Sequence, residues 1–151
     1  MRNTLLFIAL FGSILLTANE THAQCSCGVE YRNLTARDEF NRADAVFVGK
    51  IVTIKNTPPD KNNRYVQTIN FQVTRAWKQD VNFNLTLTNK IDGCKNGFEE
   101  NEEWLVYAYK NQGGTLGAYC CCTRTKPLAK ADDDVKTFVD DPPAKILRPK
   151  L

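Results

Sequence analysis

Five short segments rich in β-branched and apolar residues occupy the middle of this chain, and they favour a mainly β fold. The alternation is clearest over residues 81–88, where apolar residues at every second position are separated by Asn and Thr. Gly49, in the first segment, is predicted to mark a bulge or a bend. The five predicted strands run over residues 45–54, 64–77, 81–88, 103–110 and 115–122.

Two predicted helices, over residues 35–43 and 128–139, flank these strands. Five strands of similar length predict a small closed or partly open β-barrel, with the long second strand coiling around it and pairing twice. A β-sandwich is the alternative, although it usually has more strands in a chain of this length. The predicted barrel interior consists of apolar side chains from all five strands: Val46, Val48, Ile51, Ile69, Phe71, Val73, Phe83, Leu85, Leu105, Tyr107 and Leu116.

The first 23 residues have the pattern of a signal peptide. Arg2 gives a positive start, residues 5–16 form a short apolar run, and residues 21–23 end in Ala as cleavage sites do. The apolar run is short for a membrane-spanning helix, which needs about 20 residues. We therefore expect residues 1–23 to be removed and the protein to be secreted, or periplasmic in a Gram-negative bacterium, with no membrane attachment after cleavage.

The rest of the chain suits one domain, over residues 24–140, followed by an irregular tail over residues 141–151 that contains three of the six prolines. Acidic and basic residues are interspersed, with a formal net charge of +3, and no basic stripe carries aromatic residues between its charges. Nucleic acid is therefore not an expected partner. The acidic runs at 99–103 and 132–134 are predicted to be solvated loops and a helix start. Trp77 and Trp104 are predicted to pack in the core or at its rim.

Histidine and cysteine usage limits the chemistry of the mature chain. The only histidine, His22, lies in the predicted signal peptide, so Ser-His-Asp and Cys-His catalysis are excluded. We expect no enzyme activity, no cofactor and no metal site of the protein's own. An even number of cysteines in an exported protein predicts a disulfide framework. A Cys-only metal site is the rival reading, but the spacings do not match paired CxxC motifs. All six cysteines follow the signal peptide: Cys25, Cys27, Cys94, Cys120, Cys121 and Cys122.

Several motifs together resemble the tissue inhibitors of metalloproteinases and the wider netrin-module group. In order, they are CSC at 25–27, ADAVFVGKI at 43–51, AWK at 76–78, Cys94, WLVYAY at 104–109 and CTRTKPLAKA at 122–131. The resemblance is to the N-terminal domain of that family and covers nearly all of the mature chain. It implies an OB-fold barrel with the N-terminal segment tied across it. It also implies two disulfides, Cys25–Cys94 and Cys27–Cys122.

The cysteine triplet leaves alternatives open for the second of these bonds. Along a strand Cys120 and Cys122 point to the same face and Cys121 to the other, so Cys27 can bond Cys120 with little change of the backbone. The two remaining cysteines can form a strained Cys120–Cys121 ring, stay reduced or link two chains. Adjacent Cα atoms lie about 3.8 Å apart, below the usual disulfide range.

For function, the resemblance implies a metalloendopeptidase inhibitor whose partner is a zinc metalloprotease. The amine and carbonyl of Cys25 would chelate the protease zinc, Ser26 would enter its specificity pocket, and the loop Asp92-Gly93-Cys94 would lie beside them. Cleavage after Ala23 would leave Gln24 in front and turn the Cys25 amine into an amide, a poor metal ligand. The alternative function is a non-inhibitory exported module that binds a protein or glycan.

Overall fold

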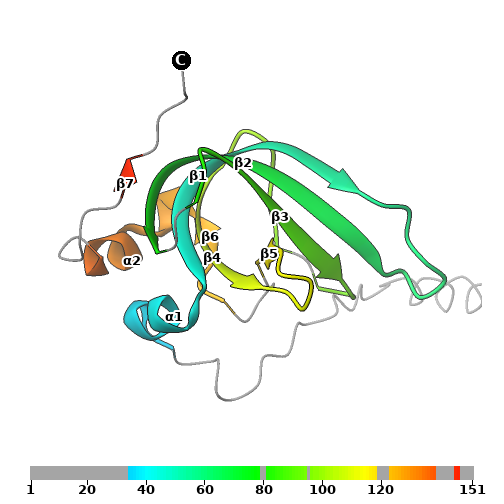
Figure 1. Ribbon diagram of the computed structural model, residues 1–151, viewed down its shortest axis with the longest axis horizontal. Helices are drawn as coiled ribbons and strands as arrows, with labels where there is room; N and C mark the ends of the chain where they lie inside the picture. The colour runs from blue at the N-terminus through cyan, green and yellow to red at the C-terminus, as the bar shows by residue number, and fades with distance from the viewer. Residues whose placement is uncertain (1–33, 79–80, 95, 119–122, 139–144, 147–151) are drawn as a thin grey trace, which may run out of the picture.

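The computed structural model describes residues 34–78, 81–94, 96–118, 123–138 and 145–146. Over these residues the protein is mainly β, with a five-stranded, nearly closed barrel and two helices (Figure 1). The five barrel strands follow one antiparallel path rather than forming two stacked sheets. The predicted barrel is therefore confirmed, and the sandwich alternative is wrong.

The barrel sheet has the strand order β3-β2-β1-β4-β5. Its strands are β1 (Ala45–Asn56), β2 (Tyr65–Lys78), β3 (Asn84–Ile91), β4 (Glu103–Lys110) and β5 (Leu116–Gly117). Two more short strands extend it, because β6 (Lys126–Pro127) pairs with β4 and β7 (Lys145–Ile146) pairs with β2. The predicted irregular tail thus contains one short paired stretch, at β7.

The β1–β2 ladder contains three register shifts, and irregularities of this kind bend a strand. The β1–β2 ladder shifts between Val48 and Gly49, which confirms the predicted bulge. A Cβ at Gly49 would lie 3.1 Å from the carbonyl oxygen of Gln72, so a larger residue would push the two strands apart. The long strand β2 pairs with β1 along one edge and with β3 along the other, as predicted.

Side chains, rather than a backbone ladder, join β3 to β5 where the barrel closes. Asn111 Nδ2 donates a hydrogen bond to the Thr88 carbonyl at 2.8 Å, and the Ala118 amide donates to Asn89 Oδ1 at 2.8 Å. A Cβ at Gly117 would lie only 2.8 Å from the same Thr88 carbonyl. We call these five residues the β3–β5 seam.

Two polar atoms beside the seam are buried without a partner. Gln67 and Asn89 stand opposite each other in the β2–β3 ladder, and both are buried. Gln67 Oε1 and Asn89 Nδ2 have no hydrogen-bond partner. Because an unpaired buried polar atom costs about 1–3 kcal/mol, this part of the barrel is held less tightly than a fully paired sheet.

The apolar residues form two clusters rather than one. The barrel interior contains Phe47, Ile51, Ile69, Phe71, Val73, Leu87, Phe98, Trp104, Val106 and Leu116, with smaller residues between them. The second cluster lies on the outer face of β1 and β4 and contains Val46, Val48, Leu105, Tyr107 and Phe138. The predicted interior was therefore wrong for Val46, Val48, Leu105 and Tyr107, which are buried on the opposite face. Phe83 and Leu85, also predicted inside, are only half-buried.

Two short helices cover that outer face. Helix α1 (Ala36–Arg42) begins with a capping box in which Thr35 and Asp38 bond reciprocally, as expected for a Thr followed three residues later by an acid. Helix α2 (Asp132–Thr137) follows a 3-10 turn at Leu128–Lys130. The predicted helix over 128–139 is thus two short pieces, separated at Ala131, which is fully buried.

Two predicted strands have different bounds in the structure. The third was predicted over 81–88, but β3 begins at Asn84 and continues to Ile91. Val81 is buried outside the strand, next to the barrel interior. The fifth was predicted over 115–122, and within the described residues β5 covers only Leu116–Gly117. Trp104 is buried and Trp77 is half-buried against the outer cluster, which confirms their predicted packing roles.

Candidate functional site

The predicted edge loop Asp92-Gly93-Cys94 follows directly after β3. Asp92 and Gly93 are exposed, and Cys94 is half-buried. Gly93 has φ +79°, a left-handed conformation that glycine adopts without strain, and nothing lies within 4 Å of where its Cβ would be. The loop therefore turns the chain at the end of β3 and leaves Asp92 and Gly93 accessible to a partner.

Cys94 is disulfide-bonded. It is the only cysteine among the described residues, so its partner is one of the other five. The predicted bonds Cys25–Cys94, Cys27–Cys122 and Cys27–Cys120, and the predicted Cys120–Cys121 ring, each include residues outside the described part. These pairings therefore stay predictions, as does the predicted role of Ser26.

The segment after Cys94 is fastened to the end of β5. Asn96 Nδ2 donates a hydrogen bond to the Ala118 carbonyl at 2.9 Å. Ala118 also bonds to Asn89, three residues before Asp92. Since residues 120–122 follow closely after Ala118, the fold brings the Cys94 loop next to the chain that leads to the cysteine triplet.

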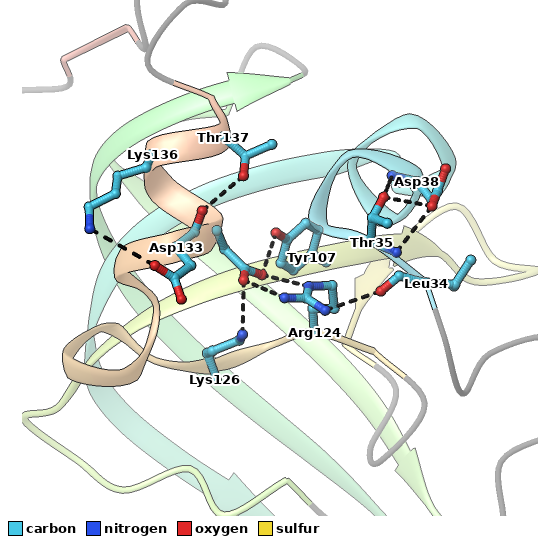
Figure 2. Close-up of polar contacts among 10 residues, drawn as sticks. Leu34, Thr35, Asp38, Tyr107, Arg124, Lys126, Asp133, Lys136 and Thr137 are labelled. Carbon is cyan, nitrogen blue, oxygen red and sulfur yellow. Dashed lines mark hydrogen bonds and ion pairs between the residues drawn. The ribbon is translucent and has the colours of Figure 1, made fainter.

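A second candidate cluster lies between the barrel and helix α2, on the other side of the sheet (Figure 2). Its centre is the carboxylate of Asp134, which is 1% exposed. Asp134 Oδ1 accepts from Arg124 Nη2 at 2.6 Å and from Lys126 Nζ at 3.0 Å. Its Oδ2 accepts from Arg124 Nε at 2.8 Å and from the Tyr107 hydroxyl at 2.9 Å. The carboxylate thus has four donors, three of them cationic.

These contacts shift the pKa values of the cluster. Burial on its own raises the pKa of Asp134, but hydrogen bonds from Arg124, Lys126 and Tyr107 outweigh it, so the pKa lies below its usual value. Burial, and then the neighbouring Asp134 charge, raise the pKa of Tyr107. The hydrogen bond to Asp134 raises the pKa of Arg124. All three groups therefore keep their ordinary ionisation at neutral pH. We call the cluster of Asp134, Tyr107, Arg124 and Lys126 the Arg124 clamp.

Hydrogen bonds from two arginines also hold α1 and the residue before its N-cap against this layer. Arg124 Nη1 donates to the Leu34 carbonyl at 3.1 Å, and Arg37 Nη2 donates to the Thr137 carbonyl at 2.7 Å. Leu34 lies seven residues after Cys27, and Arg124 lies two residues after Cys122. The Arg124 guanidinium thus holds together the two segments that lead to the predicted Cys27–Cys122 bond: the one that follows Cys27 and the one that follows Cys122.

Neither buried carboxylate of the helix layer was predicted from the sequence. The run 132–134 was predicted to be solvated, which is right for Asp132 and Asp133 and wrong for Asp134. The signal was the helical spacing, because Asp134 lies three residues after Ala131 and four before Phe138, both fully buried. Similarly, Glu39 is buried in α1 and accepts a hydrogen bond from the Tyr109 hydroxyl.

Within residues 34–78, 81–94, 96–118, 123–138 and 145–146, no group of three or more His, Cys, Asp or Glu side chains could hold a metal ion. Across the same residues, neither helix is long and apolar enough to span a bilayer. No family model matches the chain, and no curated protein matches it either.

Proposed function

We propose that this protein is an exported inhibitor of zinc metalloendopeptidases that acts through the rim of its barrel. The inhibitory rim consists of Cys25-Ser26-Cys27 together with the loop Asp92-Gly93-Cys94. The amine and carbonyl of Cys25 bind the protease zinc, and Ser26 enters the specificity pocket. This proposal combines the resemblance of the sequence with the geometry of the loop.

One observation carries the proposal: Cys94 is disulfide-bonded on an exposed turn beside the end of β5. A bond from this turn to Cys25 would hold two donor atoms at the surface of a rigid barrel. A ligand that is already fixed in its bound shape loses less conformational entropy on binding than a free peptide does. The Arg124 clamp supports the same role, since it fixes Leu34, from which the chain runs back to Cys27.

The decisive experiment compares two N-termini of the same protein. One form begins at Gln24, and the other has Gln24 deleted so that Cys25 carries a free amine. Both are assayed against a panel of zinc metalloendopeptidases. The Cys25 form is expected to inhibit at least about tenfold more tightly, because an amide nitrogen is a poor metal ligand and ten-fold corresponds to about 1.4 kcal/mol. Acetylation of its amine should return it to the level of the Gln24 form.

A second comparison tests Ser26 in the Cys25 form. Ser26→Arg should abolish inhibition, because the larger charged side chain cannot enter a pocket that accepts a small hydroxyl. The matched control is Gln112→Arg, which adds the same side chain at an exposed turn between β4 and β5. Absence of inhibition by both N-terminal forms across the panel would refute the proposed function.

A further inference from the structure

Asn96 and Gly97 form the one Asn-Gly pair in the sequence, and they lie in the segment that follows Cys94. Neither residue belongs to a helix or a strand. Asn96 is half-buried and Gly97 is exposed. Asparagine is one of the chemically labile residues of proteins. It is most labile when glycine follows, because glycine has no side chain to shield its backbone nitrogen.

The backbone nitrogen of Gly97 is open to reaction. Among the described residues no group accepts a hydrogen bond from it, and no atom lies within 4 Å of the position where a Cβ would be. The φ angle of Gly97 is not positive, so the backbone here can hold another residue without strain. The nitrogen is therefore accessible, and the covalent structure places it to form a succinimide ring with the side-chain carbonyl carbon of Asn96.

The side chain of Asn96, by contrast, is held in place. Its Nδ2 donates a hydrogen bond to the Ala118 carbonyl at 2.9 Å. Ala118 is 3% exposed, and its amide donates to Asn89 Oδ1 at 2.8 Å. The Asn96 amide thus fastens the segment after Cys94 to the end of β5. Ring closure requires this bond to break first, because the side chain has to turn toward the backbone of Gly97.

We propose that Asn96-Gly97 is a self-modification site that releases the segment after Cys94 from β5. The Gly97 nitrogen attacks Asn96 Cγ and loses its proton to water, while the Cγ–Nδ2 bond breaks and Nδ2 leaves as ammonia. Water then opens the succinimide at either of its carbonyls and gives aspartate or isoaspartate. The reaction consumes water alone, and nothing is oxidised or reduced.

The aspartate product cannot restore the contact with β5. An ionised carboxylate has no hydrogen to donate, and it would face the Ala118 carbonyl, which is also an acceptor. The Ala118 carbonyl is then left without this donor in a buried position. An unpaired buried acceptor destabilises the closed contact, so the modified segment separates from β5 more often.

The isoaspartate product strains the same segment, because it adds a carbon atom to the backbone between two fixed residues. Cys94 is held by its disulfide. Phe98 is buried in the barrel interior, with its ring centroid 4.5 Å from that of Trp104. A longer backbone between these two residues has to bulge outward. Both products therefore alter the chain directly after the loop Asp92-Gly93-Cys94.

The reaction is tested by ageing the full chain at mildly alkaline pH and following its intact mass. Peptide mapping at acidic pH, where the reaction is slow, then locates the converted residue. We expect Asn96 to convert to aspartate and isoaspartate before any other asparagine. Asn82 and Asn101 are internal controls, because both are exposed and each precedes a residue larger than glycine.

Two glycine variants test the part of the Gly97 nitrogen. Gly97→Ala should slow the conversion of Asn96 several-fold, since the added methyl group shields the attacking nitrogen. The variant should fold, because nothing lies within 4 Å of the new Cβ. Gly113→Ala is the matched control, with an equally open Cβ position in another turn, and should leave the conversion rate unchanged.

The contact with Ala118 is tested from both sides of the reaction. Before it, the folded chain should convert about five- to tenfold more slowly than the same chain in denaturant, the effect of one hydrogen bond that has to break. After it, Asn96→Asp reproduces the product. In this variant the Ala118 amide should exchange its hydrogen about five- to tenfold faster, while the amides of the β1–β4 ladder do not change.

Any one of the following results would overturn the proposal. Asn96 keeps its amide in the folded chain, or Gly97→Ala converts as fast as the unmodified protein. The folded chain converts as fast as the denatured one, or Asn96→Asp leaves hydrogen exchange at Ala118 unchanged. None of these measurements involves a protease, so the inhibitor proposal is tested separately by its own assay.

Discussion

Asp134 joins α2 to the barrel through its buried carboxylate. Its carboxylate accepts from Tyr107 on β4 and from both Arg124 and Lys126 in the segment that leads into α2. Buried carboxylates are stable only when their charge is paired and their oxygens are hydrogen-bonded, and here both conditions hold. Loss of this one charge would leave two cations without their counter-ion.

Asp134→Asn is therefore expected to lower the free energy of unfolding by about 2 kcal/mol. Breaking a buried ion pair costs about 3–5 kcal/mol, and the part-exposed Arg124 and Lys126 recover some hydration. Chemical denaturation followed by circular dichroism measures this change. The control is Asp133→Asn, which removes an exposed acid 3.9 Å from Lys136 and should cost less than about 0.5 kcal/mol. Equal effects of the two variants would contradict the clamp.

The same carboxylate gives stability a defined dependence on pH. The folded pKa of Asp134 lies below its ordinary value of 3.8, so the unfolded chain binds a proton more readily than the folded one. This contribution is fully present above that value and is lost as the pH falls through the folded pKa. We expect the unfolding free energy to drop below about pH 4. In Asp134→Asn that drop should be shallower, and parallel curves for the two proteins would disprove the assignment.

At the scale of strands and helices, the sequence predicts where the elements are better than which way they face. In β2 buried and less buried residues alternate, and its inward residues Ile69, Phe71 and Val73 were predicted correctly. In β1 and β4 five successive residues are buried, because the barrel covers one face and the helices cover the other. Where both faces are buried the period-two signal disappears, so the inward face could not be predicted.

The β3–β5 seam makes a prediction at the same scale. Gly117→Ala would place a methyl group 2.8 Å from the Thr88 carbonyl, and backbone cannot move as easily as a side chain. We expect a loss of stability of about 1–3 kcal/mol, the usual cost of overpacking. Gly113→Ala is the control, since nothing lies within 4 Å of its Cβ position and its φ is not positive. Thermal unfolding of both variants gives the comparison, and equal melting temperatures would rule out the tight approach.

For the molecule as a whole, the disulfide at Cys94 is expected to stabilise the folded barrel. Cys94→Ser should lower the unfolding free energy by about 2–4 kcal/mol, because the unfolded chain regains the freedom of the loop that the bond closes. The far-ultraviolet circular dichroism should stay close to that of the unmodified protein, since the barrel core is independent of the loop. Denaturation with and without reductant provides the measurement. An unchanged unfolding midpoint would show that the bond adds no stability.

The candidate site could be predicted only in part from the sequence. The loop Asp92-Gly93-Cys94 was expected from the family resemblance; the structure has these residues in a turn after β3, and their part in an inhibitory rim stays a prediction. The Arg124 clamp could not be predicted, because its members lie on separate elements and meet only after the barrel closes. Pairing among cysteines likewise depends on three-dimensional distances that spacing does not determine.

A barrel that closes through side chains, and not through a continuous ladder, has a preferred place to open. The contacts between Thr88, Asn89, Asn111 and Ala118 can break without breaking the β1–β2 and β1–β4 backbone pairs. The two unpaired polar atoms nearby lower the free energy needed to break these contacts, because opening would hydrate them. Local opening follows the least stable contacts. The β3–β5 seam is therefore where we expect the barrel to open first.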